Sequence, residues 1–140
     1  MKKRAAVFLC VLSLVLLTVA CGGKYSDIIS VNKQFAKVME TYVTALEKAE
    51  SAKDVAAAIN RFADGMESLA PEMKAINKKY PELRGDGDLP EELEQSRKET
   101  EAVSQRYAES FMKMMPYMAD PDVQAAQMRL SKVMSEIGQE

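Results

Sequence analysis

The fold is decided by the stretch Val55–Tyr80, which reads VAAAINRFADGMESLAPEMKAINKKY. Its large apolar residues follow one another at intervals of four and three: Val55, Ile59, Phe62, Met66, Leu69, Met73, Ile76 and Tyr80. This spacing brings them onto one face of an α-helix. Ser51 and Asp54 form a capping-box pattern just before the stretch, so the sequence predicts an amphipathic helix over residues 52–80.

Two prolines determine where this helix ends. Pro71 lies off the apolar face, and the repeat continues past it in register. We therefore expect Pro71 to face solvent and to bend the helix without ending it. Pro81 is expected to end the helix, because the residue before a proline is disfavoured in helical conformation.

The same apolar period recurs in three other segments, and no part of the sequence alternates as a β-strand does. Residues that commonly start helices precede them: Ser26 or Asp27 as an N-cap, Pro90 in a first turn, and Asp120 before Pro121. Helices with this period pack side by side at shallow angles. The sequence therefore predicts an all-α fold, an antiparallel three- to four-helix bundle with helices over residues 27–50, 52–80, 90–118 and 121–137.

Alternating helix directions would divide the loops between two ends of the bundle. The loop over residues 81–89 is expected at the end where the first helix begins. The Ser51 turn and the corner over residues 115–121 are then expected together at the opposite end.

The N-terminus has the three parts of a secretory signal. Residues 1–4 are Met-Lys-Lys-Arg, residues 5–20 are mostly Leu, Val, Phe and Ala, and small residues precede Cys21. The sixteen-residue apolar run is short for a bilayer span. The run Leu17-Thr18-Val19-Ala20-Cys21 resembles the lipobox of bacterial lipoproteins, with Thr18 where that family most often has Leu.

This resemblance implies a division of the chain into three parts. Residues 1–20 would be a cleaved signal peptide, residues 21–26 a lipidated tether and residues 27–140 the helical bundle domain. Cys21 would carry the acyl chains that hold the protein on a membrane. Gly22 stands where lipoproteins retained in the inner membrane typically carry Asp, so a host with two membranes would place the protein on the outer one, on its periplasmic side.

Composition excludes several classes of function. Cleavage would remove three basic residues and leave 16 Lys and Arg against 21 Asp and Glu, a net charge of −5 that disfavours nucleic acid as a partner. The chain contains no histidine, which removes the commonest general base and the imidazole metal ligands. No phosphate-binding loop, CxxC pair or calcium loop is found. We therefore expect no enzyme activity, no cofactor and no metal site.

Methionine is the unusual residue, since nine of ten lie beyond residue 20. Phe111, Met114, Met115 and Met118 share one face of the predicted third helix, while Met112 points elsewhere. Such a face is typical of core packing, although it also suits docking of a partner protein. Soft thioether ligands for Cu(I) are a third reading.

The sequence thus predicts a lipid-anchored, non-enzymatic helical bundle of the cell envelope with a structural or protein-interaction role. Beyond the lipobox it resembles small helical lipoproteins of bacteria in general. The alternative is a binding module for an apolar ligand or lipid, because the first half of the third helix is polar and would leave a loosely filled core.

Overall fold

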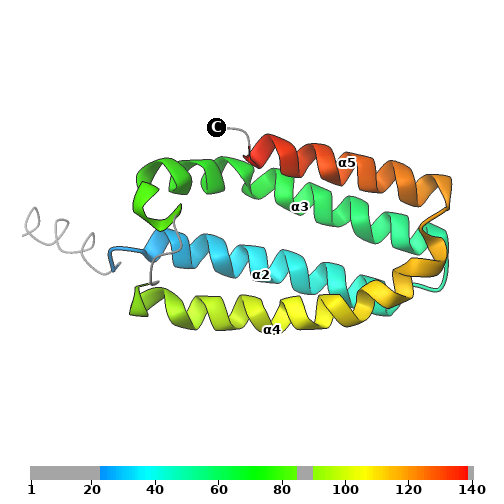
Figure 1. Ribbon diagram of the computed structural model, residues 1–140, viewed down its shortest axis with the longest axis horizontal. Coiled ribbons are helices and arrows are strands. Elements are labelled where there is room, and N and C mark those ends of the chain that lie inside the picture. Colours follow the sequence, from blue (N-terminus) through cyan, green and yellow to red (C-terminus); the bar gives the residue numbers. More distant parts are fainter. Residues whose placement is uncertain (1–22, 85–89, 139–140) are drawn as a thin grey trace, which may run out of the picture.

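The computed structural model describes residues 23–84 and 90–138, and this part of the chain is all-α (Figure 1). Its four long helices are α2 (Ser26–Glu47), α3 (Ala52–Lys79), α4 (Glu91–Met114) and α5 (Pro121–Gly138). Two 3-10 turns, η1 (Pro81–Arg84) and η2 (Met115–Tyr117), follow α3 and α4. The predicted helical bundle is confirmed. The predicted signal peptide and Cys21 lie outside the described residues.

The helices pack in the order α5, α3, α2, α4, so that α2 and α3 form a central pair (Figure 1). Consecutive helices run in opposite directions, as predicted. Each outer helix, however, packs mainly on the central helix that runs in its own direction, α4 on α2 and α5 on α3.

Helix α3 begins at the predicted capping box. The Ser51 side chain accepts a hydrogen bond from the Asp54 amide at 3.2 Å and donates one to the Asp54 carboxylate at 2.7 Å. The same carboxylate accepts a hydrogen bond from the Glu50 amide at 3.3 Å, and these donors lower the pKa of Asp54. Pro71 is exposed and α3 continues through it to Lys79, as expected.

Two predicted helix ends, those of α2 and α4, were wrong by a few residues. Helix α2 ends at Glu47 instead of residue 50. Its free backbone carbonyls accept hydrogen bonds from the next elements: Lys113 Nζ of α4 donates to the Glu47 carbonyl at 2.9 Å, and the Tyr117 hydroxyl of η2 donates to the Glu50 carbonyl at 3.1 Å. Helix α4 ends at Met114 and continues as η2, because Pro116 has no amide hydrogen to donate. Tyr25, not Ser26 or Asp27, occupies the N-cap of α2.

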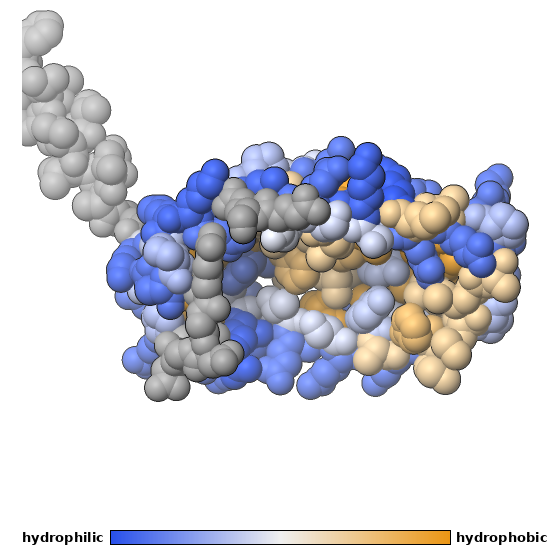
Figure 2. Space-filling model, turned by 45° about the horizontal axis from the view of Figure 1, so that its top comes forward, coloured by the Kyte–Doolittle hydropathy of each residue, from blue (hydrophilic) through white to orange (hydrophobic). Residues whose placement is uncertain are grey.

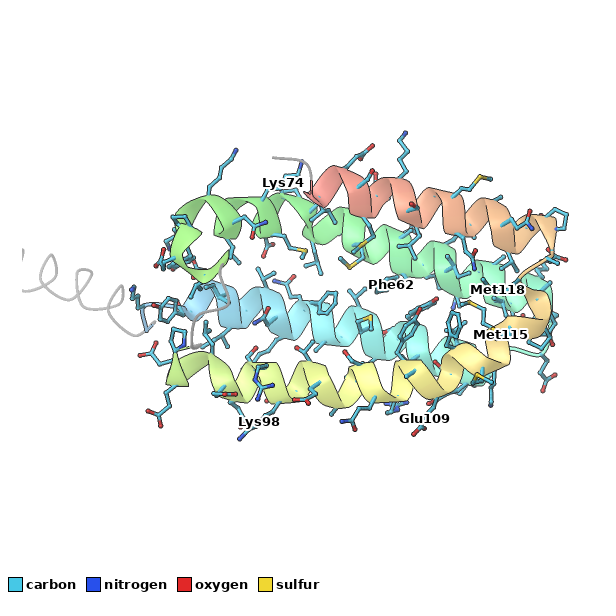
Figure 3. All side chains as sticks on the ribbon, viewed as in Figure 1. Phe62, Lys74, Lys98, Glu109, Met115 and Met118 are labelled. Atoms are coloured by element: carbon cyan, nitrogen blue, oxygen red, sulfur yellow. The ribbon has the colours of Figure 1, made fainter. Side chains whose placement is uncertain are left out.

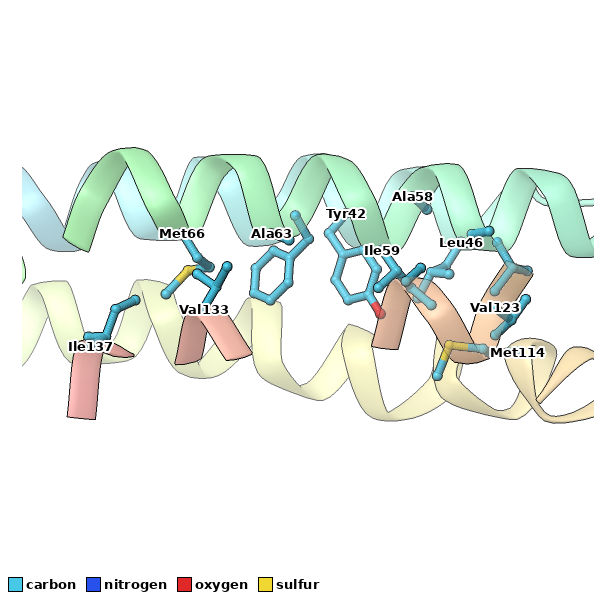
Figure 4. Close-up of a cluster of buried hydrophobic side chains, with 14 residues drawn as sticks. Tyr42, Leu46, Ala58, Ile59, Ala63, Met66, Met114, Val123, Val133 and Ile137 are labelled. Atoms are coloured by element: carbon cyan, nitrogen blue, oxygen red, sulfur yellow. The ribbon is translucent and has the colours of Figure 1, made fainter. Parts of the chain in front are cut away.

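Most buried side chains come from α2 and α3 and form one long cluster between the helices (Figure 4). Its largest fully buried members are Leu46, Ile59, Met66, Val55 and Val123. A smaller cluster closes the other end of the bundle, where α2 begins: Tyr25, Ile28, Tyr80 and Leu93. The core therefore depends on the central pair, and the outer helices cover it.

Helices α2 and α3 are in close contact at Gly65. A Cβ atom added there would lie 2.6 Å from Cγ1 and 3.0 Å from Cγ2 of Val38. Valine in a helix has one strongly preferred rotamer, so its two methyl groups cannot both turn aside. Gly65 is required by this contact although glycine disfavours a helix.

We expect Gly65→Ala to lower the melting temperature. The clash should cost about 1–3 kcal/mol, which exceeds the gain in helix propensity of up to about 1 kcal/mol. Thermal unfolding followed by circular dichroism measures the difference. In a Val38→Ala background the same change should be stabilising, and a loss of stability there would contradict the assignment.

Candidate functional site

The four predicted docking residues do not form one surface. Met114 is 4% exposed and belongs to the core cluster (Figure 4). Phe111 and Met118 are partly buried against that cluster. The Met118 sulfur accepts a hydrogen bond from the side-chain amide of Gln127 at 2.9 Å. Met115 alone is exposed, at 53% (Figure 3). The thioethers therefore lie in different environments, which favours packing over a common Cu(I) site.

Met112, which the helical face excluded, is the more exposed methionine of this segment at 67%. Together with Met115 it forms an exposed apolar pair at the end of α4, which we call the methionine pair. Met128 and Met134 are also exposed, on α5. Figure 2 shows apolar side chains gathered toward the η2 end of the face that it presents.

The opposite end of the bundle is closed by a polar cluster around Asp27. Its carboxylate lies 2.7 Å from Lys79 Nζ and accepts a hydrogen bond from the Tyr80 hydroxyl at 2.9 Å. The same hydroxyl lies 2.7 Å from the carbonyl oxygen of Lys24. Lys79 is the largest cause of a lowered pKa at Asp27, followed by Tyr80. These contacts hold the start of α2 against the end of α3.

The two ends of the bundle are therefore arranged as the alternating helices predicted. The start of α2 lies beside η1, since Lys24 and Glu82 are 4.0 Å apart. At the other end, the Tyr117 hydroxyl of η2 binds the carbonyl next to Ser51. Gly23, the first described residue, and the methionine pair consequently lie at opposite ends (Figure 1).

A cavity of about 240 Å³ opens between α4 and α5, above the central pair. No charged residue contributes to its lining, which is Tyr42, Ile59, Tyr107, Phe111, Met114, Gln127, Leu130 and Ser131. The Tyr42 and Tyr107 rings are 5.8 Å apart at their centroids. Burial, and then Tyr107, raises the pKa of Tyr42, so its hydroxyl stays neutral at physiological pH. This cavity suits packing or an uncharged ligand.

The described residues contain neither a helix long and apolar enough to cross a membrane nor three His, Cys, Asp or Glu side chains grouped to hold a metal ion. No protein-family model matches the chain, and neither the curated proteins nor the solved structures include a significant match. The candidate sites are therefore assessed on their own chemistry.

We expect Asp27→Asn to reduce the acid sensitivity of the fold. The pKa of Asp27 is lowered in the folded protein. The ionised Asp27 carboxylate therefore contributes its full stabilisation when the pH is above the pKa of an unfolded Asp, about 3.9. This stabilisation is lost as the pH falls through the lower pKa of the folded state. The variant should lose less melting temperature than the parent as pH falls below about 4. Glu109→Gln, an exposed change on α4, is the control and should follow the parent.

Proposed function

We propose that this chain is a lipid-anchored protein of the bacterial cell envelope that binds a partner protein and catalyses no reaction. The observation that supports this best is the exposed methionine pair at the end of the bundle opposite Gly23. The anchor itself is proposed from the lipobox resemblance at Cys21. In a host with two membranes, the outer membrane with the bundle in the periplasm is the proposed location.

The geometry of the bundle indicates which end of the protein would lie away from the membrane. Residues 21–25 would reach at most about 17 Å when fully extended, so the start of α2 would stay close to the lipid headgroups. The 22 residues of α2 add about 33 Å along the helix axis. The η2 end would then be the part of the protein farthest from its own membrane.

The chemistry of methionine suits this end for docking. Its thioether side chain is flexible and polarizable, and it adapts to irregular apolar surfaces. Met112 and Met115 are three residues apart and can contact the same partner surface. The partner expected is an envelope protein that presents an apolar patch of its own.

The anchor predicts a specific mass. The purified protein should begin at Cys21 and carry the mass of its acyl chains, and it should stay with membranes through high-salt and carbonate washes. Cys21→Ser should abolish the added mass, whereas Cys10→Ser should leave it unchanged, because bulky Leu9 precedes that cysteine. A parent protein with unmodified Cys21 would contradict the anchor.

The methionine pair predicts a site-specific crosslink. A photoreactive amino acid at position 112 should crosslink to one envelope protein in intact cells, and Met115→Gln should weaken that crosslink without lowering the melting temperature, since Met115 is exposed. Met114→Gln should instead lower stability by about 2–5 kcal/mol, because it places an amide in the core. The same photoreactive group at Met128 is the control. An equal crosslink from position 128 would argue against the methionine pair.

A further inference from the structure

A second cavity, of about 190 Å³, lies between α2 and α3, and we call it the α2–α3 slot. Small side chains from both helices line it, Ala45 on α2 and Ala58 on α3. The stacked rings of Tyr42 and Phe62 contribute to its lining, with centroids 4.6 Å apart and ring planes 16° from parallel. The lining of the slot is therefore mainly apolar.

Two cationic residues also line this slot, Lys37 on α2 and Arg61 on α3. Both residues are exposed, and within residues 23–84 and 90–138 neither side chain makes an ion pair or a hydrogen bond. By contrast, Arg97, Arg106 and Arg129 all pair with carboxylates at 2.6–3.1 Å. Lys37 and Arg61 thus leave a local positive charge beside apolar surface.

We propose that the α2–α3 slot binds the carboxylate form of a long-chain fatty acid. The alkyl chain would lie against Tyr42, Phe62 and the small residues, and the carboxylate would bind between Lys37 and Arg61. A guanidinium offers two parallel donors to a carboxylate, and the lysine adds a second charge. The apolar lining would then recognise the alkyl chain, and two cations without another ion-pair partner would recognise the carboxylate.

The size of the slot selects this ligand among the anionic amphiphiles. Sites that enclose a drug-sized molecule usually measure about 300–1,000 Å³, so the slot holds part of a single alkyl chain. A phospholipid with two chains is too large for it. A small inorganic anion would use the cations but leave the apolar lining in water. This site is separate from the methionine pair and does not depend on lipid attachment at Cys21.

Isothermal titration of the full Cys21→Ser chain, purified and delipidated, tests the proposal with three probes. Dodecanoate should bind, whereas acetate, which has the charge without the chain, should not. The double change Lys37→Gln, Arg61→Gln should weaken dodecanoate binding about tenfold or more and leave the weaker binding of dodecanol unchanged. The exposed pair Lys48→Gln, Lys98→Gln is the matched control and should bind dodecanoate like the parent.

A larger side chain placed in the slot tests where the alkyl chain of the ligand binds. Ala58→Leu should reduce binding of dodecanoate and of dodecanol together, because it occupies the slot, and circular dichroism verifies that this variant is folded. Full dodecanoate affinity in the Lys37→Gln, Arg61→Gln variant would overturn the charge recognition. Unchanged binding in folded Ala58→Leu would overturn the slot and place the chain elsewhere, for example in the cavity between α4 and α5.

Discussion

The close contact between α2 and α3 is the constraint on which the rest of the bundle depends. Gly65 lets the two helices approach until Val38 fills the space of a missing Cβ, and the stacked Tyr42 and Phe62 rings extend the contact along the pair. These two helices also supply most of the buried side chains. Burial of that apolar surface is the main favourable term in folding, so the outer helices add to a core that the central pair already defines. Helix α4 buries few residues of its own, and two of its four buried positions are serines.

Because each outer helix packs on a different member of the pair, α4 and α5 leave an apolar cavity between them. Ion pairs at the surface connect the outer helices to the inner ones: Arg106 binds Glu47, and Arg129 binds Asp64 and Glu67. Exposed pairs of this kind contribute little free energy, typically about 0–1 kcal/mol. These ion pairs nevertheless join α4 only to α2 and α5 only to α3. None of them involves Lys37 or Arg61 beside the slot.

The number of helices, their faces and the arrangement of the loops could be predicted from the sequence, because the period of apolar residues states which side of each helix is buried. The choice of neighbour could not, since a buried face is compatible with more than one partner helix. The α2–α3 slot could not be predicted from the sequence either. Ala45 and Ala58 are unremarkable in the sequence, and they line a cavity only once α2 and α3 lie in their actual register.

The methionine segment shows where periodicity stops being informative. Counting residues at 100° each places Met115 on the same face as Met114, yet Met114 is 4% exposed and Met115 is 53% exposed. Pro116 cannot donate the hydrogen bond that an α-helix needs, so α4 ends at Met114 and the chain continues as η2 from Met115. Met112 is exposed because it lies off the buried face of α4, whereas Met115 is the first residue after α4 ends. The end of α4 is visible only in three dimensions, so the sequence could not show that Met115 is exposed while Met114 is buried.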